Sequence, residues 1–514
     1  MYQNRRSTYT GFILVFVGLK VILNLFAISH YGFQRDELLY LALGDHLAWN
    51  YKEVPPFIAL LGRISSTVFG SSVFATRIFS TLAAGLIIWF TGLLTVELGG
   101  KKFAITLACL ALICSPAFLA SNYLFQPVVF DQLWWVLTAF LAVKYINTSS
   151  TKYLYFIGAA IGVGLLTKYS MGFFSVALVI GLLLTKQRRV LANKHFWFAM
   201  ILALLIFLPA IIWEAIHHFP FFTHMNELRK NQLQYVKSSD FIVQEVLDNG
   251  IAVIIWLTGL SFLLFAFKLR KYQFLAFGYL LTFIILLELN GKSYYLFGAY
   301  PMLFAAGAYG FERWIKNIAL RVVVVLVFTL PVLLVLPMFL PILSLNDTLA
   351  KFDRVNQKYP FLHFVSTWED RKVHRTSQDY GDMFGWDELT QKVAATYHSL
   401  TPDEQKHTII IADNYGEAGA IHHFGPQYGL PDAISLDSSF ALWSPPSVNA
   451  DYVIFVDDSD DIKQLGLFAA SYKKTGEIDN SLAVENGTGI YLLSHPTPKL
   501  NGLYQQIRAK KLSE

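Results

Sequence analysis

The sequence of 514 residues is dominated by apolar side chains, since 54% of its residues are hydrophobic and only 15% are charged. A soluble domain has about 45–50% apolar and about 25% charged residues, so this composition excludes a wholly soluble protein and predicts a membrane protein. The formal net charge of +5 is small for this length and does not support nucleic-acid binding. The length exceeds that of one compact domain, which predicts a membrane part with an appended soluble part.

Apolar runs recur along the first two thirds of the chain. A helix needs about twenty apolar residues to cross a bilayer, and runs of this kind predict about eleven spans. The predicted spans lie at residues 11–29, 72–96, 103–121, 128–143, 154–167, 171–185, 196–216, 251–267, 273–290, 294–311 and 321–343.

Every second connection between the predicted spans is basic. These connections carry Lys101 and Lys102, Lys144 and Lys152, Lys186 to Lys194, Lys268 to Lys271, and Arg313 to Arg321. The positive-inside rule places this set in the cytoplasm, together with the N-terminus. An odd number of spans then places the segment after the last span outside the cytoplasm.

The segment from 346 to 514 differs in character from residues 1–345. It is charged and contains β-branched runs at 408–413 and 452–458, with a helical pattern at 387–400. We therefore predict a polytopic α-helical membrane domain over 1–345 and an extracytoplasmic α/β domain over 346–514.

Ionisable side chains gather near the outer ends of the predicted helices. Such residues are costly at membrane depth and mark functional sites. They are Asp36, Glu37, Arg77, Asp131, Lys168, Glu214, Glu288 and Lys292. A mixed set of acids and bases on one rim suits an anionic, lipid-linked substrate, although each residue alone also fits an interfacial anchor or half of an ion pair.

The motifs 36-DELLYLALGDHLAWNYKEVPPFIALL-61, 76-TRIFS-80, 167-TKYS-170 and 292-KSYYLFGAYPMLFAAGA-308 carry a family resemblance. They resemble the GT-C glycosyltransferases of the protein O-mannosyltransferase and lipid A aminoarabinose transferase group, and most of all the bacterial dolichyl-phosphate-mannose-protein mannosyltransferase-like branch. The resemblance covers roughly residues 10–345, and the block 415-YGEAGAIHHFGPQYGLPDAIS-435 also resembles the tail domain of that branch. It implies an inverting transferase in a bacterial inner membrane, with a polyprenyl-phosphate sugar donor and a lipid, glycan or protein acceptor.

The resemblance assigns catalytic and donor-binding roles to individual residues. The essential carboxylate of the family corresponds to Asp36, and Glu37 beside it orients its neighbours or pairs with Arg35. The donor phosphate is expected to bind Lys292 with Tyr294 or Tyr295, and Arg77 and Lys168 are further phosphate candidates. The amphipathic stretch 38–49 is expected to lie in the membrane interface and to help form the donor cleft.

One position departs from the family pattern. The aminoarabinose transferases have a donor-contacting lysine before their Pro-Pro pair, whereas this chain has Val54 there and Lys52 two residues earlier. The phosphate contacts of the donor are therefore expected to differ.

Three further features leave alternatives open. Asp131, His217 and His218 are candidate substrate-binding residues. The two histidines and His224 are also candidate ligands of a divalent metal. Adjacent histidines rarely bind one ion, so the sequence does not require a cofactor. The glycines of 415-YGEAGA-420 lack the spacing of a phosphate cradle and favour turn chemistry.

Two other classes of function fit a membrane protein with an outer domain. A secondary transporter or lipid flippase would place its key ionisable residues near the bilayer midplane in repeated halves, and the sequence has no internal repeat. A non-catalytic assembly partner would keep the fold without the active site, and the presence of Asp36 argues against it. The transferase hypothesis is therefore favoured.

Overall fold

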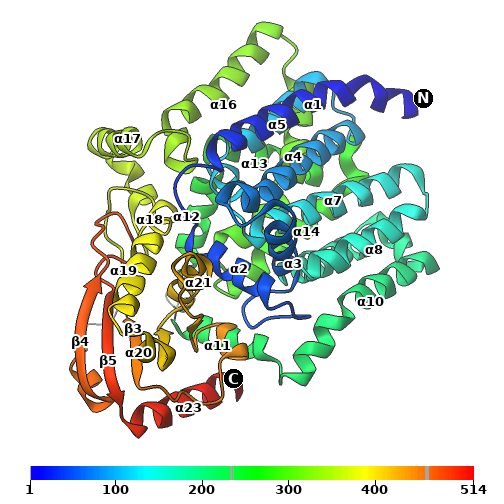
Figure 1. The fold of residues 1–514 in the computed structure, drawn as a ribbon. Helices are drawn as coiled ribbons and strands as arrows, with labels where there is room; N and C mark the ends of the chain where they lie inside the picture. The colour runs from blue at the N-terminus through cyan, green and yellow to red at the C-terminus, as the bar shows by residue number, and fades with distance from the viewer. Residues whose placement is uncertain (1, 232–233, 235–236, 458–461, 514) are drawn as a thin grey trace.

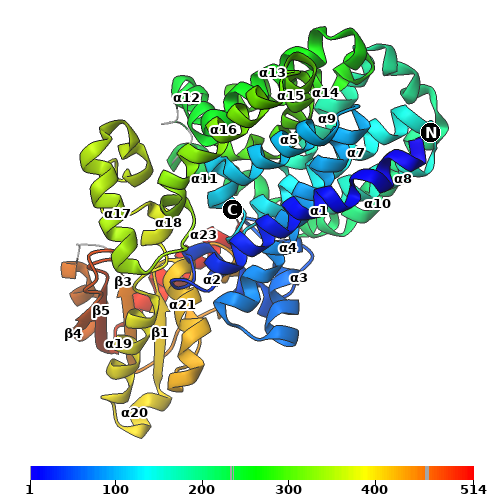
Figure 2. The ribbon, with the colours of Figure 1, turned by 90° about the horizontal axis from the view of Figure 1, so that it is seen from above.

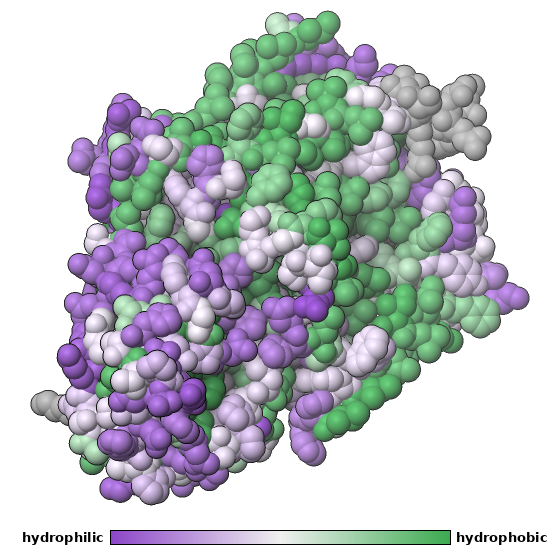
Figure 3. All heavy atoms as spheres, viewed as in Figure 1, coloured by the Kyte–Doolittle hydropathy of each residue, from purple (hydrophilic) through white to green (hydrophobic). Residues whose placement is uncertain are grey.

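The structure is a computed structural model that describes residues 2–231, 234, 237–457 and 462–513. A helical bundle forms one part, and an α/β domain lies against one end of it (Figures 1 and 2). On the face shown in Figure 3, apolar side chains cover the bundle and polar side chains cover the α/β domain. The predicted combination of an apolar helical part and a C-terminal α/β part is confirmed.

The bundle is formed by long helices joined by short helical turns. Its first helices are α1 (Tyr2–Ala27), α2 (Arg35–Asp45), α3 (Phe57–Ile64), α4 (Val73–Glu97), α5 (Lys102–Cys114), α6 (Pro116–Ser121), α7 (Pro127–Thr148), α8 (Lys152–Leu165) and α9 (Ser170–Leu183). They are followed by α10 (Lys194–Ile216), α11 (Pro220–Asn231), α12 (Ser238–Asn249), α13 (Val253–Phe265), α14 (Gln273–Glu288), α15 (Tyr300–Trp314) and α16 (Ile318–Phe339).

The predicted count of eleven spans is not confirmed. Within the described residues, seven helices are long and apolar enough to cross a membrane, or eight if a pair bent by 112° counts as one span. The seven are Tyr9–Ala27, Val73–Glu97, Pro127–Thr148, Lys194–Ile216, Ser238–Phe265, Phe267–Glu288 and Ile318–Phe339. The other predicted spans are shorter helices, namely α5, α8, α9 and α15.

The basic connections meet at one end of the bundle. The Lys144 ammonium pairs with Glu97 at 2.5 Å, and the Lys271 ammonium donates to Asn147 at 2.7 Å. Glu312 accepts a hydrogen bond from the backbone N–H of Lys101 at 2.7 Å. The connections predicted to lie on the other side line a pocket at the opposite end, so the two sets are separated as the alternation of charge predicts.

The α/β domain contains a five-stranded mixed sheet in the order β2-β1-β3-β5-β4. The strands are β1 (Thr408–Ala412), β2 (Ala433–Ile434), β3 (Tyr452–Asp457), β4 (Ala469–Glu477) and β5 (Gly489–Pro496). β1 pairs in parallel with β2 and β3, while β5 pairs antiparallel with β3 and β4. The two predicted β-branched runs are thus the central strands β1 and β3.

The helices of this domain connect the sheet to the bundle. They are α17 (Leu345–Lys358), α18 (Gln378–Gly381), α19 (Trp386–His398), α20 (Pro402–Lys406), α21 (Tyr415–Phe424), α22 (Phe440–Trp443) and α23 (Pro498–Ser513). α19 matches the predicted helix at 387–400. α21 corrects the turn predicted at 415–420, because this glycine-containing segment continues as a regular helix.

α2 lies between the bundle and the α/β domain, next to α21 in both ribbon views. Residues from Glu37 to Gly44 are buried, and only Leu47 and Trp49 at the end of the predicted interfacial stretch are exposed large hydrophobic residues. An exposed apolar face is therefore not formed over most of 38–49, and the position of this stretch relative to the membrane stays a prediction. Its apolar side chains are covered by protein instead.

A charged contact joins the far ends of α2 and α21. His422 lies 3.1 Å from Asp45 and 3.3 Å from Asp432, and Arg63 pairs with Asp45 at 2.8 Å. Burial lowers the pKa of His422, but the two carboxylates outweigh it and raise that pKa above its usual value. His46 and His423 also face this cluster.

We expect this contact to make the folded protein more stable at low pH. A histidine with a raised pKa stabilises the fold fully below its unfolded pKa of about 6.5, and this contribution is lost as the pH rises through the folded pKa. His422→Gln should therefore lower stability by about 0.5–1 kcal/mol at pH 5.5, because the carboxylates are partly exposed, and by less at pH 8.5. Thermal unfolding at both pH values, with His398→Gln as the control, measures this difference; an equal loss at both would contradict the account.

Candidate functional site

The first turn of α2 holds Asp36 in a defined position. Gln34 caps the helix, because its side-chain oxygen accepts the backbone N–H of Asp36 at 2.8 Å. In return, the Glu37 carboxylate accepts the backbone N–H of Gln34 at 2.9 Å, which completes a capping box. The helix therefore starts at a fixed residue, with the side chain of Asp36 directed out of its first turn.

Glu37 forms a fully buried ion pair with Arg77 rather than with Arg35. Arg77 Nε lies 2.8 Å from Glu37 Oε1 and Arg77 Nη2 lies 2.7 Å from Oε2, with both side chains at 0% exposure. Glu37 Oε1 also accepts the N–H of Phe125 at 2.8 Å, and Arg77 donates to the carbonyl of Gly32 at 2.9 Å. Both residues lie outside the pocket wall, so their geometry assigns them to the scaffold that holds Asp36.

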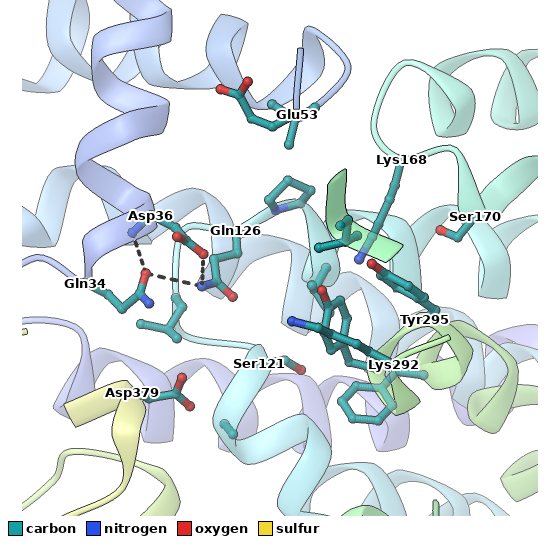
Figure 4. Close-up of a pocket in the computed structure, with 18 of the residues that line it drawn as sticks. Gln34, Asp36, Glu53, Ser121, Gln126, Lys168, Ser170, Lys292, Tyr295 and Asp379 are labelled. Atoms are coloured by element: carbon teal, nitrogen blue, oxygen red, sulfur yellow. Dashed lines mark hydrogen bonds between the residues drawn. The ribbon is translucent and has the colours of Figure 1, made fainter. Parts of the chain in front are cut away.

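A pocket of about 720 Å³ opens between the bundle and the α/β domain. Figure 4 shows its interior. The ionisable groups in its wall are Arg35, Asp36, Glu53, Lys168, His224, Asp248, Lys292, Glu369, Asp379 and Asp382. Side chains that the sequence separates by more than three hundred residues therefore face one cavity.

Lysines and tyrosines form one end of this pocket. The Lys168 ammonium lies 4.4 Å from the ring centre of Tyr294 and 4.6 Å from that of Tyr295. Lys292 precedes the short helix Ser293–Ala299 that carries these tyrosines, and the amino groups of both lysines point into the same part of the pocket (Figure 4). Two cations and two phenol groups in one place form a site suited to an anion such as a phosphate.

Asp131 lies behind the lysine end of the pocket and fixes the position of its neighbours there. Its two carboxylate oxygens accept hydrogen bonds from Trp135 Nε1 at 2.8 Å and Ser170 Oγ at 2.7 Å. Burial lowers the pKa of Lys168, and the charge of Asp131 opposes that change. Asp131 therefore lies behind the pocket wall, where it fixes the turn that presents Lys168 rather than contacting a ligand in the cavity.

Asp36, Asp379 and Asp382 lie at the other end of the pocket, whereas Asp248 lines the pocket beside Lys292 and accepts a hydrogen bond from Ser293 at 2.6 Å. Asp36 Oδ1 accepts a hydrogen bond from the Tyr415 hydroxyl at 2.8 Å, and Oδ2 has a longer contact of 3.4 Å with Gln126. Burial, with the nearby charge of Asp36, raises the pKa of Asp379 to about 6. Burial likewise raises the pKa of Asp382 to about 7, so these two carboxyls are partly protonated near neutral pH.

The two predicted substrate-binding histidines lie away from this cavity. His217 is exposed, stacks on Trp213 with 4.0 Å between ring centres, and donates through Nδ1 to the carbonyl of that residue at 2.8 Å. His218 is also exposed and has a positive φ of 61°. The pocket is lined instead by His224, and the described residues contain no group of three or more histidine, cysteine or acidic side chains able to hold a metal.

Val54 occupies the position where the family pattern has a lysine, and the nearby Lys52 does not replace that lysine in the pocket. Val54 lines the pocket, whereas the Lys52 ammonium donates to the backbone carbonyl of Lys511 in the C-terminal helix α23. The cationic end of the pocket is therefore built from Lys168 and Lys292.

Sequence reasoning did not find Tyr415, Asp379 or Asp382. All three come from the α/β domain, and no local pattern at 379–382 or 415 distinguishes them from ordinary turn and helix-start residues. Glu53 was also missed, although it directly precedes the quoted Val-Pro-Pro string. Burial raises the pKa of Glu53 to about 7, and its carboxylate accepts a hydrogen bond from Ser439 at 2.7 Å.

Comparison with known proteins gives one family match. Residues 53–213 match the family described as dolichyl-phosphate-mannose-protein mannosyltransferase. No curated protein matches the sequence.

Among the solved structures that share the fold are two of one protein. The crystal structure of ArnT from Cupriavidus metallidurans bound to undecaprenyl phosphate has a TM-score of 0.62 at 15% identity, covering 94% of this chain and 98% of that chain. The apo form of ArnT gives a TM-score of 0.64 at 14% identity with the same coverage. Together with the family match, this likeness confirms the predicted resemblance to GT-C glycosyltransferases of the ArnT and protein mannosyltransferase type.

The buried ion pair predicts a large loss of stability when one partner is removed. Arg77→Met should destabilise the protein by about 3–5 kcal/mol, because it leaves the Glu37 carboxylate buried without its counter-charge. Arg63→Met breaks the half-exposed pair with Asp45 and should cost no more than about 1 kcal/mol. Thermal unfolding of both variants tests this difference, and similar stabilities for the two would show that Arg77 is not part of the scaffold.

Proposed function

We propose, on the premise that this chain has the fold of the GT-C glycosyltransferases, that it transfers a sugar from a polyprenyl-phosphate donor to an acceptor hydroxyl. The observation that carries the proposal is the division of one pocket into two ends. Lys168 and Lys292 with their tyrosines form the cationic end, and Asp36 faces the same cavity from the other end. An anionic leaving group needs the cationic end, and the base that deprotonates the acceptor must lie at a distance from those cations.

The leaving group explains why one base is sufficient. A phosphate with a second pKa of about 6 departs as an anion and needs no proton from a general acid. Hydrolysis of an ordinary glycoside, by contrast, requires a carboxylic acid to protonate the leaving oxygen and a second carboxylate on the other side. The lysines at the cationic end supply charge stabilisation in place of that acid.

Each bond change then has a place in the pocket. The acceptor oxygen attacks the anomeric carbon while the bond between that carbon and the phosphate oxygen breaks. Asp36 takes the proton of the acceptor hydroxyl. The phosphate leaves with the bonding electron pair toward Lys168 and Lys292. Attack opposite to departure inverts the configuration of the anomeric carbon.

The architecture favours an enzyme over a transporter or flippase. The pocket opens beside the α/β domain at one end of the bundle, while ion pairs such as Lys144–Glu97 lie at the other end, away from the pocket wall. A transporter site lies instead near the bilayer midplane between repeated halves. We further propose that the pocket faces away from the cytoplasm in a bacterial inner membrane, because the basic connections gather at the other end.

Asp36→Asn should reduce sugar transfer by about 10²–10⁴-fold, because it removes the base and keeps the shape of the side chain. The measurement is release of undecaprenyl phosphate from a panel of undecaprenyl-phosphate hexoses and pentoses, with membrane lipid extract as acceptor source. Asp387→Asn, on α19 outside the pocket wall, is the matched control and should retain activity. Near-normal turnover of Asp36→Asn would contradict the assignment of Asp36 as the base.

Lys292→Ala should lower the catalytic rate more than donor affinity, because its contact with the phosphate strengthens as negative charge develops. The expected loss of transition-state stabilisation is about 2–4 kcal/mol, the effect of removing one preorganised donor. Turnover and undecaprenyl-phosphate affinity should be measured separately for Lys292→Ala, Lys292→Gln and the exposed control Lys499→Gln. If Lys292→Gln behaves like the control, the residue only anchors the end of a helix.

A further inference from the structure

We propose that the α/β domain completes the active site and that Tyr415 is the residue that positions Asp36. This inference rests on the proposed function, in which Asp36 is the base. Tyr415 belongs to α21, which is separated from Asp36 by 379 residues in sequence, yet its hydroxyl donates a hydrogen bond of 2.8 Å to Asp36 Oδ1. A domain that only covered the cleft would not need to contact the base.

The hydrogen bonds of Asp36 leave one oxygen for the acceptor. Tyr415 engages Oδ1, whereas the one contact of Oδ2 within the described part of the chain is the 3.4 Å contact with the Gln126 side chain. Because Gln34 also holds the backbone N–H of Asp36, the carboxylate is fixed at both its main-chain and side-chain ends. Oδ2 is therefore the oxygen presented to an acceptor hydroxyl in the cavity.

Tyr415 is itself held in place. Its backbone N–H donates to Asp437 at 3.1 Å, and the Asn414 side chain caps α21 by accepting the backbone N–H groups of Gly416 and Glu417. The Arg35 guanidinium lies 5.4 Å from the centre of the tyrosine ring. Burial and the neighbouring Asp36 raise the pKa of Tyr415 well above its usual value, so the hydroxyl stays protonated and acts as the donor.

Two glycines let α21 approach α2 closely enough for this hydrogen bond. A Cβ on Gly416 would lie 2.7 Å from Arg35 Cγ, and a Cβ on Gly419 would lie 3.0 Å from Leu38 Cβ and 3.1 Å from the Leu38 backbone carbon. The glycines of 415–420 therefore serve close helix packing. A Cβ at 419 would therefore require Leu38 or α21 to shift by a few tenths of an ångström, next to the turn that carries Asp36.

A second contact from the α/β domain acts on the same turn. The backbone carbonyl of Asp382 accepts the N–H of Arg35, and its carboxylate has a 3.4 Å contact with Gln34. Gln34 and Arg35, at the start of α2, thus contact the α/β domain through Asp382, and Asp36 contacts it through Tyr415. The contacts that dock the α/β domain on the bundle are consequently the same contacts that position Asp36.

The test is Tyr415→Phe, which keeps the ring beside Arg35 and removes only the hydroxyl. We expect kcat to fall by about 10–100-fold while the donor KM changes less than about threefold, because the lost hydrogen bond acts on a charged group. The acidic limb of the pH–rate profile should also move to higher pH, since a hydrogen bond to a carboxylate favours its ionised form. The other ionisable groups that interact with Asp36 are Arg35, Tyr40, Tyr294, Asp379 and Asp382, and all are retained in this variant.

A second readout needs no turnover. Carbodiimides react with protonated, accessible carboxyl groups, so the rate of modification of Asp36 can be followed by peptide mass spectrometry across a pH series. Tyr415→Phe should speed this modification and extend it to higher pH. The matched control is Tyr504→Phe, which removes the hydroxyl of a buried tyrosine that donates to the Pro445 carbonyl at 2.7 Å, outside the pocket wall.

The glycines provide an independent variant. Gly419→Ala should reproduce the kinetic defect of Tyr415→Phe, and the double variant should be little worse than either, because both break the same contact. Gly502→Ala is the control, since a Cβ on this helical glycine meets no atom within 4 Å. Thermal unfolding of each variant shows whether the protein remains folded.

The possible outcomes separate this inference from the proposed function. If Asp36→Asn is inactive but Tyr415→Phe matches Tyr504→Phe in turnover, pH profile and carbodiimide modification, the positioning role is overturned and the base remains. If Asp36→Asn is active, the base assignment fails. Faster carbodiimide modification in Tyr415→Phe would then still support the contact itself.

Discussion

The arrangement of the pocket depends on the buried ion pair between Glu37 and Arg77. The Glu37 carboxylate joins three chain segments, because it accepts hydrogen bonds from Arg77, Gln34 and Phe125. These contacts fix the start of α2 and the loop just before Gln126, so they place Asp36 relative to the rest of the cavity. A buried charge pair is costly to assemble and very costly to break, which gives this turn one stable geometry. The Asp36 carboxylate can therefore remain half-buried and still be held in position.

The separation of charge within the pocket is what connects this geometry to chemistry. The lysine end suits a departing phosphate, and the Asp36 end suits an attacking hydroxyl. Each end is built by a different part of the chain, since the lysines follow membrane helices whereas Asp36 is flanked by side chains of the α/β domain. Partial protonation of Asp379 and Asp382, caused by burial, reduces the negative charge around Asp36. The two domains thus share one cavity, and neither encloses it alone.

Much of the fold could be predicted because hydropathy and charge are local signals. Long apolar runs located the helices of the bundle, and β-branched runs located β1 and β3. The number of spans could not be predicted, because α5, α8, α9 and α15 are short helices whose apolar runs continue into adjoining turns. Lys168, Lys292 and Asp36 could be grouped since each directly follows or precedes a span. The partner of Glu37 and the contact of Tyr415 depend on segments 40 and 379 residues away, and the same glycines suit a turn or a close helix contact.

The most direct measurement is a structure of the protein bound to undecaprenyl phosphate in a lipid nanodisc. We predict that the phosphate lies between Lys168 and Lys292, with its oxygens within about 4 Å of both ammonium groups, the range of an ion pair. We also predict that Asp36 keeps its hydrogen bond to Tyr415 and does not contact the phosphate. A phosphate bound at the Asp36 end, with no contact to either lysine, would contradict the division of the pocket on which the proposed transfer depends.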